Sequence, residues 1–167
     1  PAARERARQY PFEFSGGMLQ RVMIATALAC KPALLIADEP TTALDVTVQD
    51  QVLGLMQEIQ REDGMAIVLV THDLGVVARM ADDVAVMYAG QVVEHGPVDH
   101  IFYRHAHPYT AGLLQALPGA ARARGQHLLP IAGSPPDLRA PPAGCAYAAR
   151  CPRAMRICAR LEPPEFV

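Results

Sequence analysis

Residues 33–39 read Ala33-Leu34-Leu35-Ile36-Ala37-Asp38-Glu39, a short apolar run that ends in two acids. Such a run predicts a β-strand that is buried on both faces. A second apolar run, 65–70, is followed at once by Thr71-His72-Asp73. Residues 43–62, between the two runs, predict a long helix, because their apolar members recur at helical spacing as Val48, Val52, Met56 and Ile59. Strand, helix and strand in this order predict a parallel α/β core.

The segment before this core is predicted to be helical. Residues 1–9 are expected to form a surface helix, and a second helix is expected over 18–29 with Ser15 as its N-cap. The expected apolar face of the second helix consists of Val22, Ile24, Ala25 and Leu28. Because the chain begins with Pro1 inside a helical pattern, we expect it to be a piece of a longer protein.

The segment after the core predicts more regular structure and then a change of composition. A helix is expected over 74–81, and two strands, Val84–Tyr88 and Gln91–Glu94, are expected to pair as an antiparallel hairpin at the edge of the sheet. Residues 97–118 are again helical in pattern. The remainder is rich in proline, glycine and arginine, which predicts a loop-rich appendage.

The composition is that of a globular domain with no strong charge. Hydrophobic residues make up 51% of the 167 residues and charged residues 19%, which argues against disorder. The formal net charge of −2 predicts no bulk attraction to nucleic acid or to anionic lipid. No apolar run approaches the roughly 20 residues that a membrane-spanning helix needs.

Three short stretches have residue types suited to phosphate chemistry. The first is Ser15-Gly16-Gly17, where a capped helix start leaves backbone N–H groups free and the helix dipole adds positive charge, so that an anion can bind. Taken alone, such a stretch is more often a plain N-cap.

The other two stretches follow the predicted strands. Asp38 and Glu39 stand at the carboxyl end of a strand, where α/β proteins place ligands: one carboxylate can hold Mg²⁺ through water, and its neighbour can act as a general base. His72 would share this sheet edge if the two strands are neighbours, and it could donate a hydrogen bond to a terminal phosphate. A solvated strand end and a structural histidine are the alternatives for each stretch alone.

The order of the three stretches resembles that of the ABC ATPases. Phe14–Met18 resembles the signature motif, although Phe14 replaces the commonest leucine and Met18 the commonest glutamine. Leu34–Glu39 resembles the Walker B strand, with Glu39 in the position of the catalytic glutamate. Ala43-Leu44-Asp45 resembles the D-loop, and His72 the switch histidine. The resemblance implies a P-loop NTPase core with a mainly parallel sheet.

The resemblance also implies how these residues work together. In the family two ATPase domains pair head to tail, so Ser15, Gly16 and Gly17 are expected to contact the terminal phosphate of an ATP held by the partner. Three residues are expected to act on the ATP of their own subunit: Asp38 as a ligand of Mg²⁺, and Glu39 and His72 as catalytic residues. The D-loop aspartate is expected to be Asp45.

One part of such a site is absent from this sequence. A P-loop needs Gly-x-x-x-x-Gly-Lys-Ser/Thr, whereas the one lysine here, Lys31, precedes Pro32. No Q-loop is found either. We expect both to lie upstream of Pro1, and we expect this stretch alone to bind ATP poorly and to hydrolyse little.

The later part of the chain indicates which branch of the ABC ATPases it resembles. Tyr88–Gly96 and His107-Pro108-Tyr109-Thr110, with the helix pattern that follows, resemble the ATPase subunits of oligopeptide and dipeptide importers. The implied function is to energise import of such peptides across the cell membrane of a bacterium or archaeon, from its cytoplasmic face. The implied partners are a second ATPase subunit, two transmembrane permease subunits and, indirectly, an extracytoplasmic peptide-binding protein.

We therefore expect three functional regions. Residues 1–30 are expected to end a helical subdomain that carries the signature, residues 31–96 to form the ATPase core, and residues 97–167 to form a C-terminal extension of the peptide-importer type.

The cysteines suggest a metal centre. Cys145, Cys151 and Cys158 follow the spacing Cys-x₅-Cys-x₆-Cys, which resembles the C-terminal motif of the same subunits, some of which carry a [4Fe–4S] cluster. A cubane cluster takes four thiolates, so the fourth is expected beyond Val167. Cys30 is expected to be a buried free thiol instead. A structural zinc site or reduced thiols in a loop are the alternatives.

Three other functions are compatible with parts of the pattern. A nickel or other small-solute importer would share the same tail. A non-transport ABC ATPase that acts on DNA or ribosomes would be expected to carry coiled-coil or strongly basic segments, and none is visible. A metal-binding module with a decayed ATPase is disfavoured by Asp38, Glu39 and His72.

Overall fold

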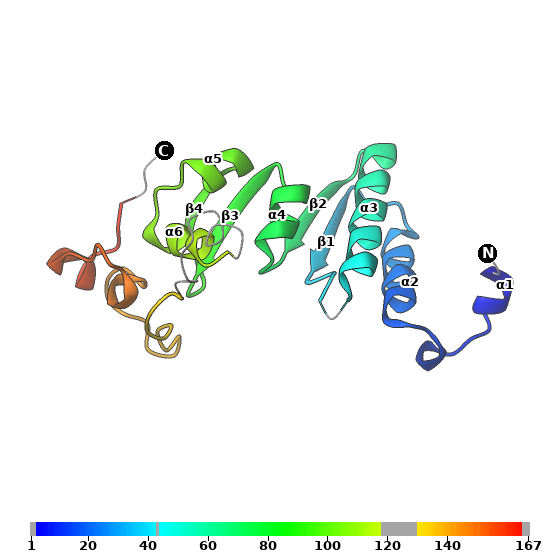
Figure 1. Ribbon diagram of the computed structural model, residues 1–167, viewed down its shortest axis with the longest axis horizontal. Coiled ribbons are helices and arrows are strands. Elements are labelled where there is room, and N and C mark those ends of the chain that lie inside the picture. Colours follow the sequence, from blue (N-terminus) through cyan, green and yellow to red (C-terminus); the bar gives the residue numbers. More distant parts are fainter. Residues whose placement is uncertain (1–2, 43, 118–129, 165–167) are drawn as a thin grey trace. The chain divides into compact units, whose positions relative to one another are not determined.

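The computed structural model describes residues 3–42, 44–117 and 130–164 (Figure 1). Ala43 of the expected D-loop, and the end of the expected helical stretch at Pro118, lie outside the described residues. The chain divides into two compact units, residues 1–80 and residues 81–167. The three functional regions that the motifs predict, with boundaries after residues 30 and 96, are not tested by this division and remain a prediction.

The first unit alternates helices with two strands. Its elements are α1 (Ala3–Arg6), a 3₁₀ helix η1 (Pro11–Glu13), α2 (Gly16–Leu28), β1 (Leu34–Asp38), α3 (Val46–Asp63), β2 (Ala66–Val70) and α4 (Leu74–Met80). The two strands are parallel, with Leu34 opposite Ala66 and Asp38 opposite Val70. The predicted order of strand, helix and parallel strand is therefore confirmed. The N-terminal helix is shorter than expected, because it ends at Arg6.

Local sequence signals explain where α3 begins and ends. Asp45 is its N-cap, and the Asp45 side chain accepts a hydrogen bond of 2.9 Å from the Val48 amide. Gly64 ends the helix in the left-handed conformation, with φ of 64°, which glycine adopts without steric cost. The face that points inward carries Val52, Leu53 and Met56, all nearly inaccessible to solvent.

The core of the first unit lies on one side of the sheet. Ile24 of α2, Leu35 of β1 and two residues of α3, Val52 and Met56, form a single buried cluster with Met65. In Figure 1, α2 and α3 run next to each other beside β1. This packing fixes α2 against the strand that ends in the two acids.

Three expectations about burial are wrong. The strands are not buried on both faces, because Ile36 is 68% exposed and Val70 49% exposed, on the side of the sheet away from the core. In α2 only Ile24 and Leu28 pack against the core, whereas Val22 and Ala25 are exposed. Cys30 is exposed rather than buried, because it lies in the turn after α2 has ended.

The second unit is built on a hairpin. Its elements are β3 (Asp83–Tyr88), β4 (Gln91–Pro97), α5 (Val98–Tyr103), α6 (Pro108–Gln115) and two 3₁₀ helices, η2 (Ala148–Arg150) and η3 (Arg156–Ala159). The predicted hairpin is confirmed, but the expectation that it forms the edge of the parallel sheet is wrong, because among the described residues β3 and β4 pair with each other as a separate two-stranded sheet. The turn residues Ala89 and Gly90 both have positive φ, as a tight two-residue turn requires. The expected helical stretch after residue 97 consists of two helices, because the chain is not helical between Tyr103 and Pro108. The loop-rich tail is confirmed over residues 130–164.

Aromatic rings hold the tail against the hairpin in the second unit. The Tyr147 ring lies 5.2 Å from the Tyr88 ring of β3 and 5.4 Å from the Tyr109 ring of α6, measured between centroids. Tyr147 is only 2% exposed. Rings of this size contribute much of the buried area of a small unit, so Tyr147 anchors the tail.

Among the residues described, none of the helices is both long and apolar enough to cross a lipid bilayer.

Candidate functional site

The carboxyl ends of β1 and β2 bring the predicted catalytic residues together. The pairing continues one step past the strands, since the Glu39 amide donates a hydrogen bond of 2.9 Å to the Val70 carbonyl. Glu39 therefore stands beside the turn that begins at Thr71. The expectation that Glu39 and His72 share one sheet edge is confirmed, while their catalytic roles remain predictions.

Glu39 and His72 are in direct contact. The distance from His72 Nδ1 to Glu39 Oε1 is 2.7 Å, and the Thr42 hydroxyl donates a hydrogen bond of 2.7 Å to Glu39 Oε2. Glu39 has a φ of 47°, a left-handed conformation that is uncommon for a residue with a side chain and that is often found at functional sites. The backbone therefore takes an unusual conformation where it presents this carboxylate.

The contact changes the proton affinity of both groups. The hydrogen bond with His72, followed by that with Thr42, lowers the pKa of Glu39 below its ordinary value. The hydrogen bond with Glu39, followed by the charge of Glu39, raises the pKa of His72. Both shifts favour an imidazolium paired with a carboxylate.

Asp38 occupies the last position of β1 and is exposed to solvent. An exposed carboxylate at this position has room for a hydrated cation, so the residue fits the water-mediated Mg²⁺ contact that the sequence predicts. Together Asp38 and Glu39 place two carboxylates at one strand end, on either side of one peptide bond.

The Ser-Gly-Gly stretch forms the start of α2, as predicted. Ser15 is the N-cap, with extended backbone, and its hydroxyl accepts a hydrogen bond of 3.4 Å from the Met18 amide. Gly17 packs so closely on α3 that a Cβ atom at this position would overlap with Cγ1 of Val48. A Cβ at Gly16 would meet Leu44 Cδ2 at an ordinary 3.7 Å. Gly17 therefore serves packing as well as any anion contact.

Four residues that support this site were not predicted from the sequence. Thr42 orients Glu39, and Gln20 donates a hydrogen bond of 2.6 Å to the Pro40 carbonyl. Asp73 accepts hydrogen bonds from the Gly75 amide, at 2.8 Å, and from Gln49 Nε2, at 3.2 Å. A signal existed only for Asp73, because an aspartate two residues before a glycine at a helix start is a common capping pattern. Gln20 and Gln49 contact residues that are distant in the chain, and Thr42 contacts Glu39 three residues before it, in a turn whose conformation the sequence pattern does not specify.

In the second unit, the stretch His107-Pro108-Tyr109-Thr110 builds the start of α6. The His107 side chain is the N-cap, because its Nδ1 accepts a hydrogen bond of 3.1 Å from the Tyr109 amide. Glu94 of β4 accepts hydrogen bonds from the amides of Ala106, at 2.5 Å, and His107, at 3.2 Å. The motif therefore ties α6 to the hairpin.

Acidification is expected to loosen this helix start. Burial lowers the pKa of His107 although the charge of Glu94 opposes the shift, and the cap requires the neutral imidazole. Since the folded-state pKa lies below the ordinary value of about 6.5, the unfolded form gains the proton first as the pH falls. The stability of the α6 start is thus complete above about pH 6.5 and decreases below it.

Hydrogen exchange measured between pH 5 and pH 8, corrected for intrinsic exchange rates, tests this prediction at the amides of α6. His107→Asn is the control, because its amide oxygen can cap the helix without titrating. Protection in the wild type should decrease below about pH 6.5, and protection in the variant should not. An identical pH profile for both proteins would contradict the prediction.

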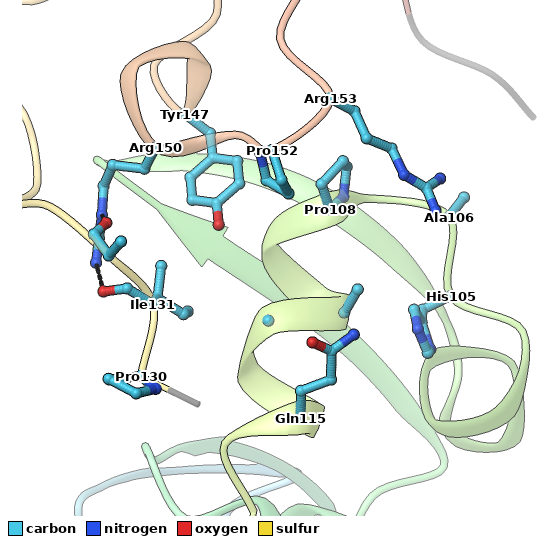
Figure 2. A pocket seen from close by; sticks show the side chains of 13 residues that line it. His105, Ala106, Pro108, Gln115, Pro130, Ile131, Tyr147, Arg150, Pro152 and Arg153 are labelled. Carbon is cyan, nitrogen blue, oxygen red and sulfur yellow. Dashed lines mark hydrogen bonds between the residues drawn. The ribbon is translucent and has the colours of Figure 1, made fainter. Parts of the chain in front are cut away.

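A surface pocket of about 360 Å³ lies between α6 and the tail (Figure 2). Arg150 crosses its wall and donates hydrogen bonds to the carbonyls of Ala132, at 2.8 Å, and Ile131, at 2.9 Å. Figure 2 shows His105 and Gln115 on the side of the pocket opposite Arg150, and Arg153 near Ala106. Because Arg150 donates to two backbone carbonyls of the segment before it, it stabilises the fold of the tail.

The cysteines of the tail do not converge on a metal-binding arrangement. The Cys145 amide donates a hydrogen bond of 2.8 Å to the Cys158 carbonyl, and Cys151 Sγ accepts one of 3.4 Å from the Arg153 amide. Across residues 3–42, 44–117 and 130–164, no three histidine, cysteine or acidic side chains lie close enough together to hold a metal ion. The hypothesis of an iron–sulfur cluster is therefore not supported, and the chemistry proposed below uses none.

Comparison with known proteins finds two family models that match separate parts of the chain. Residues 1–42 match the family described as "ABC transporter", and residues 93–158 match "Oligopeptide/dipeptide transporter, C-terminal region". The chain is 56% identical, over all 167 residues and 50% of the relative, to the dipeptide transport ATP-binding protein DppD of Bacillus subtilis. It is 55% identical, over 99% of its length and 49% of the relative, to the oligopeptide transport ATP-binding protein OppD of Salmonella typhimurium. The chain thus spans about half the length of the curated relatives it matches.

Solved structures with similar folds are ABC cassettes. One is cbiO1 of Clostridium perfringens, part of the ABC transporter complex cbiONQ, with a TM-score of 0.52 and 37% identity over 55% of this chain and 37% of that one. Another is the dimeric post-hydrolysis state of the ATP-binding cassette MJ0796 bound to ADP and Pi, with a TM-score of 0.50 and 36% identity over 55% of this chain and 39% of that one. These neighbours confirm the predicted ABC ATPase fold. On this evidence the chain belongs to the family of ATP-binding subunits of oligopeptide and dipeptide ABC transporters.

Proposed function

We propose that the complete protein hydrolyses ATP to energise import of oligopeptides or dipeptides, with residues 31–96 of this chain supplying part of the catalytic machinery. The observation that carries the proposal is the contact between Glu39 and His72 at the carboxyl ends of two parallel strands. The names of the relatives support a peptide cargo over nickel or other small solutes.

In the proposed reaction Glu39 takes the proton of the water that attacks the terminal phosphate of ATP. Asp38 would hold Mg²⁺ through water, and the ion would neutralise charge on the phosphates. In the structure Glu39 is a weakened base, because His72 and Thr42 both hydrogen-bond to its carboxylate and lower its pKa. Moving the His72 imidazole from Glu39 to the terminal phosphate would remove one of these bonds and strengthen the base.

We propose that the start of α2 serves a second nucleotide. Ser15, Gly16 and Gly17 would offer backbone N–H groups and the positive end of the helix dipole to the terminal phosphate of an ATP seated on a partner subunit. Asp45 would lie at the same interface, as the D-loop residue. In the structure its carboxylate caps α3, which fixes the backbone between Leu44 and Val48.

The proposed assembly has two ATPase subunits, alike or related, attached to two transmembrane permease subunits at the cytoplasmic face of the membrane. An extracytoplasmic peptide-binding protein would deliver the cargo. Residues 97–167 would be the part specific to this branch of the family, where the His107–Thr110 motif fastens α6 to the hairpin and Tyr147 fastens the tail.

A transport assay tests the proposal. The complete subunit is reconstituted with its membrane subunits and binding protein in proteoliposomes, and uptake of a labelled dipeptide, a labelled oligopeptide and ⁶³Ni²⁺ is compared with and without ATP. Uptake of peptide that requires ATP supports the proposal. ATP-dependent uptake of nickel alone would assign the protein to another cargo, and no ATP hydrolysis by the reconstituted complex would refute the catalytic part.

A further inference from the structure

A glutamine of α2 is attached to the turn that carries the acid pair. Gln20 Nε2 donates a hydrogen bond of 2.6 Å to the carbonyl of Pro40, the residue directly after Glu39. Pro40 is buried, and the contact itself is partly buried. The neighbouring amides are used elsewhere in the turn, because Thr42 N donates to the Glu39 carbonyl and Leu44 N to the Thr41 carbonyl. Gln20 is therefore the hydrogen-bond partner that the described residues offer the Pro40 carbonyl.

A carbonyl in a partly buried contact is stabilised by a hydrogen-bond donor, and loss of that donor has a free-energy cost. If Gln20 is shortened or loses its amide, the Pro40 peptide must rotate toward another donor or remain unpaired. Either change acts on the backbone one residue from Glu39, whose left-handed conformation and side-chain contacts already depend on that turn. The position of the Glu39 carboxylate is thus sensitive to a residue on α2.

The same face of α2 also contacts α3, since Gly16 and Gly17 are one helical turn before Gln20. Gly17 touches Val48 so closely that no side chain fits between them, and Gly16 faces Leu44. The α2 start therefore contacts both the turn after Glu39, through Gln20, and the first turn of α3, through Gly17. Displacement of α2 along its axis would act on both contacts.

We infer that Gln20 is a positioning residue that couples the α2 start to Glu39, so that an anion bound at Ser15–Gly17 changes the alignment of the general base in the same subunit. This inference rests on the proposed function, in which the α2 start contacts the partner's nucleotide and Glu39 acts on its own. Gln20 then connects the two nucleotide sites of the paired subunits through a side chain that touches neither ATP.

The test replaces the donor in the complete subunit by Gln20→Met, which keeps the length of the side chain. Gln57→Met is the matched control, because Gln57 Nε2 also donates from a helix to a backbone carbonyl, that of Arg79, at 3.2 Å, but the contact is away from the Glu39 turn. We expect kcat for ATP hydrolysis to fall about tenfold in Gln20→Met, with KM for ATP changed less than about twofold and with a lower Hill coefficient. Gln57→Met should be close to the wild type. The inference fails if the two variants have equal kcat and Hill coefficients.

Mixed pairs of subunits separate coupling from local damage. In the first pair, one subunit carries Gln20→Met and Glu39→Gln together, so the remaining active site uses the altered α2 start with the partner's intact base. In the second pair, the two substitutions are on different subunits, so the remaining active site uses an intact α2 start with the base next to residue 20. Coupling predicts that both pairs are slower than a pair with Glu39→Gln alone, whereas a reduction in only one pair means that Gln20 supports only that element and overturns the inference.

The same experiment distinguishes failure of this inference from failure of the proposed function. If the wild-type subunit hydrolyses ATP and Glu39→Gln abolishes the activity, the proposed function stands whatever Gln20→Met does. If Glu39→Gln leaves hydrolysis intact, the proposed base is wrong, and the coupling inference fails with it.

Discussion

Glu39→Gln in the complete ATP-binding subunit should reduce steady-state ATP hydrolysis by about 10² to 10⁴-fold, because a general base contributes this much to the rate. The amide keeps the shape of the side chain and can still contact His72 and Thr42, which lie 2.7 Å from the carboxylate oxygens. It cannot accept a proton from water. ATP binding should therefore persist, and the subunits should accumulate as an ATP-bound pair.

Turnover measured by phosphate release, and nucleotide retention measured after rapid desalting, check this result together. Glu58→Gln is a suitable control, since Glu58 is an exposed carboxylate on α3 in the same unit. Normal hydrolysis by Glu39→Gln would exclude Glu39 as the base. A loss of binding along with turnover would show instead that the carboxylate supports the site structurally.

Gly17→Ala should destabilise the protein by about 1–3 kcal/mol, because its Cβ would overlap with Val48 Cγ1 in a packed region. Alanine is the better helix former, but the gain of at most about 1 kcal/mol is smaller than the cost of the overlap. Adding Val48→Ala removes the atom that clashes. The double variant should recover stability relative to the sum of the single changes, with a coupling free energy of about 1–2 kcal/mol.

Urea unfolding of the four proteins in this double-mutant cycle measures the coupling. Gly16→Ala is the control within the same motif, because a Cβ there meets Leu44 at an ordinary 3.7 Å and should cost little. Additive effects of Gly17→Ala and Val48→Ala would refute the packing explanation. If the double variant regains stability but not ATP hydrolysis, Gly17 has a separate role toward phosphate.

The sequence predicted the order of elements because each element of the first unit carries its own signals. Asp45 and Gly64 mark the two ends of α3 by capping chemistry that operates within one turn of chain. The apolar runs predicted β1 and β2, and α/β alternation predicted that they are parallel. The presence of an acid pair and a histidine at one sheet edge followed from this topology, because parallel strands end on the same side.

Burial was predicted less well, because it depends on what packs against each face. The outer face of the sheet, with Ile36 and Val70, is as apolar as the inner face with Leu35, and nothing in the periodicity says that only one of them is covered within the first unit. Val22 of α2 satisfies the same spacing rule as Ile24 and yet is exposed. The cysteine spacing likewise could not show whether the three thiols converge.

The sequence alone determined which groups are candidates for the reaction, since Glu39, His72 and the Ser15–Gly17 helix start are defined by residue type and by position relative to strands and caps. Only the tertiary structure decided how these groups are held: the Glu39–His72 contact and the attachment of Gln20 to Pro40 join residues from different elements, whereas Thr42 contacts Glu39 from within the same turn. The physical reason is the distance along the chain over which each interaction acts. Capping and periodicity act over a few residues of chain, whereas the hydrogen bond that places a carboxylate is formed across space after the core around Val52 and Met56 has packed.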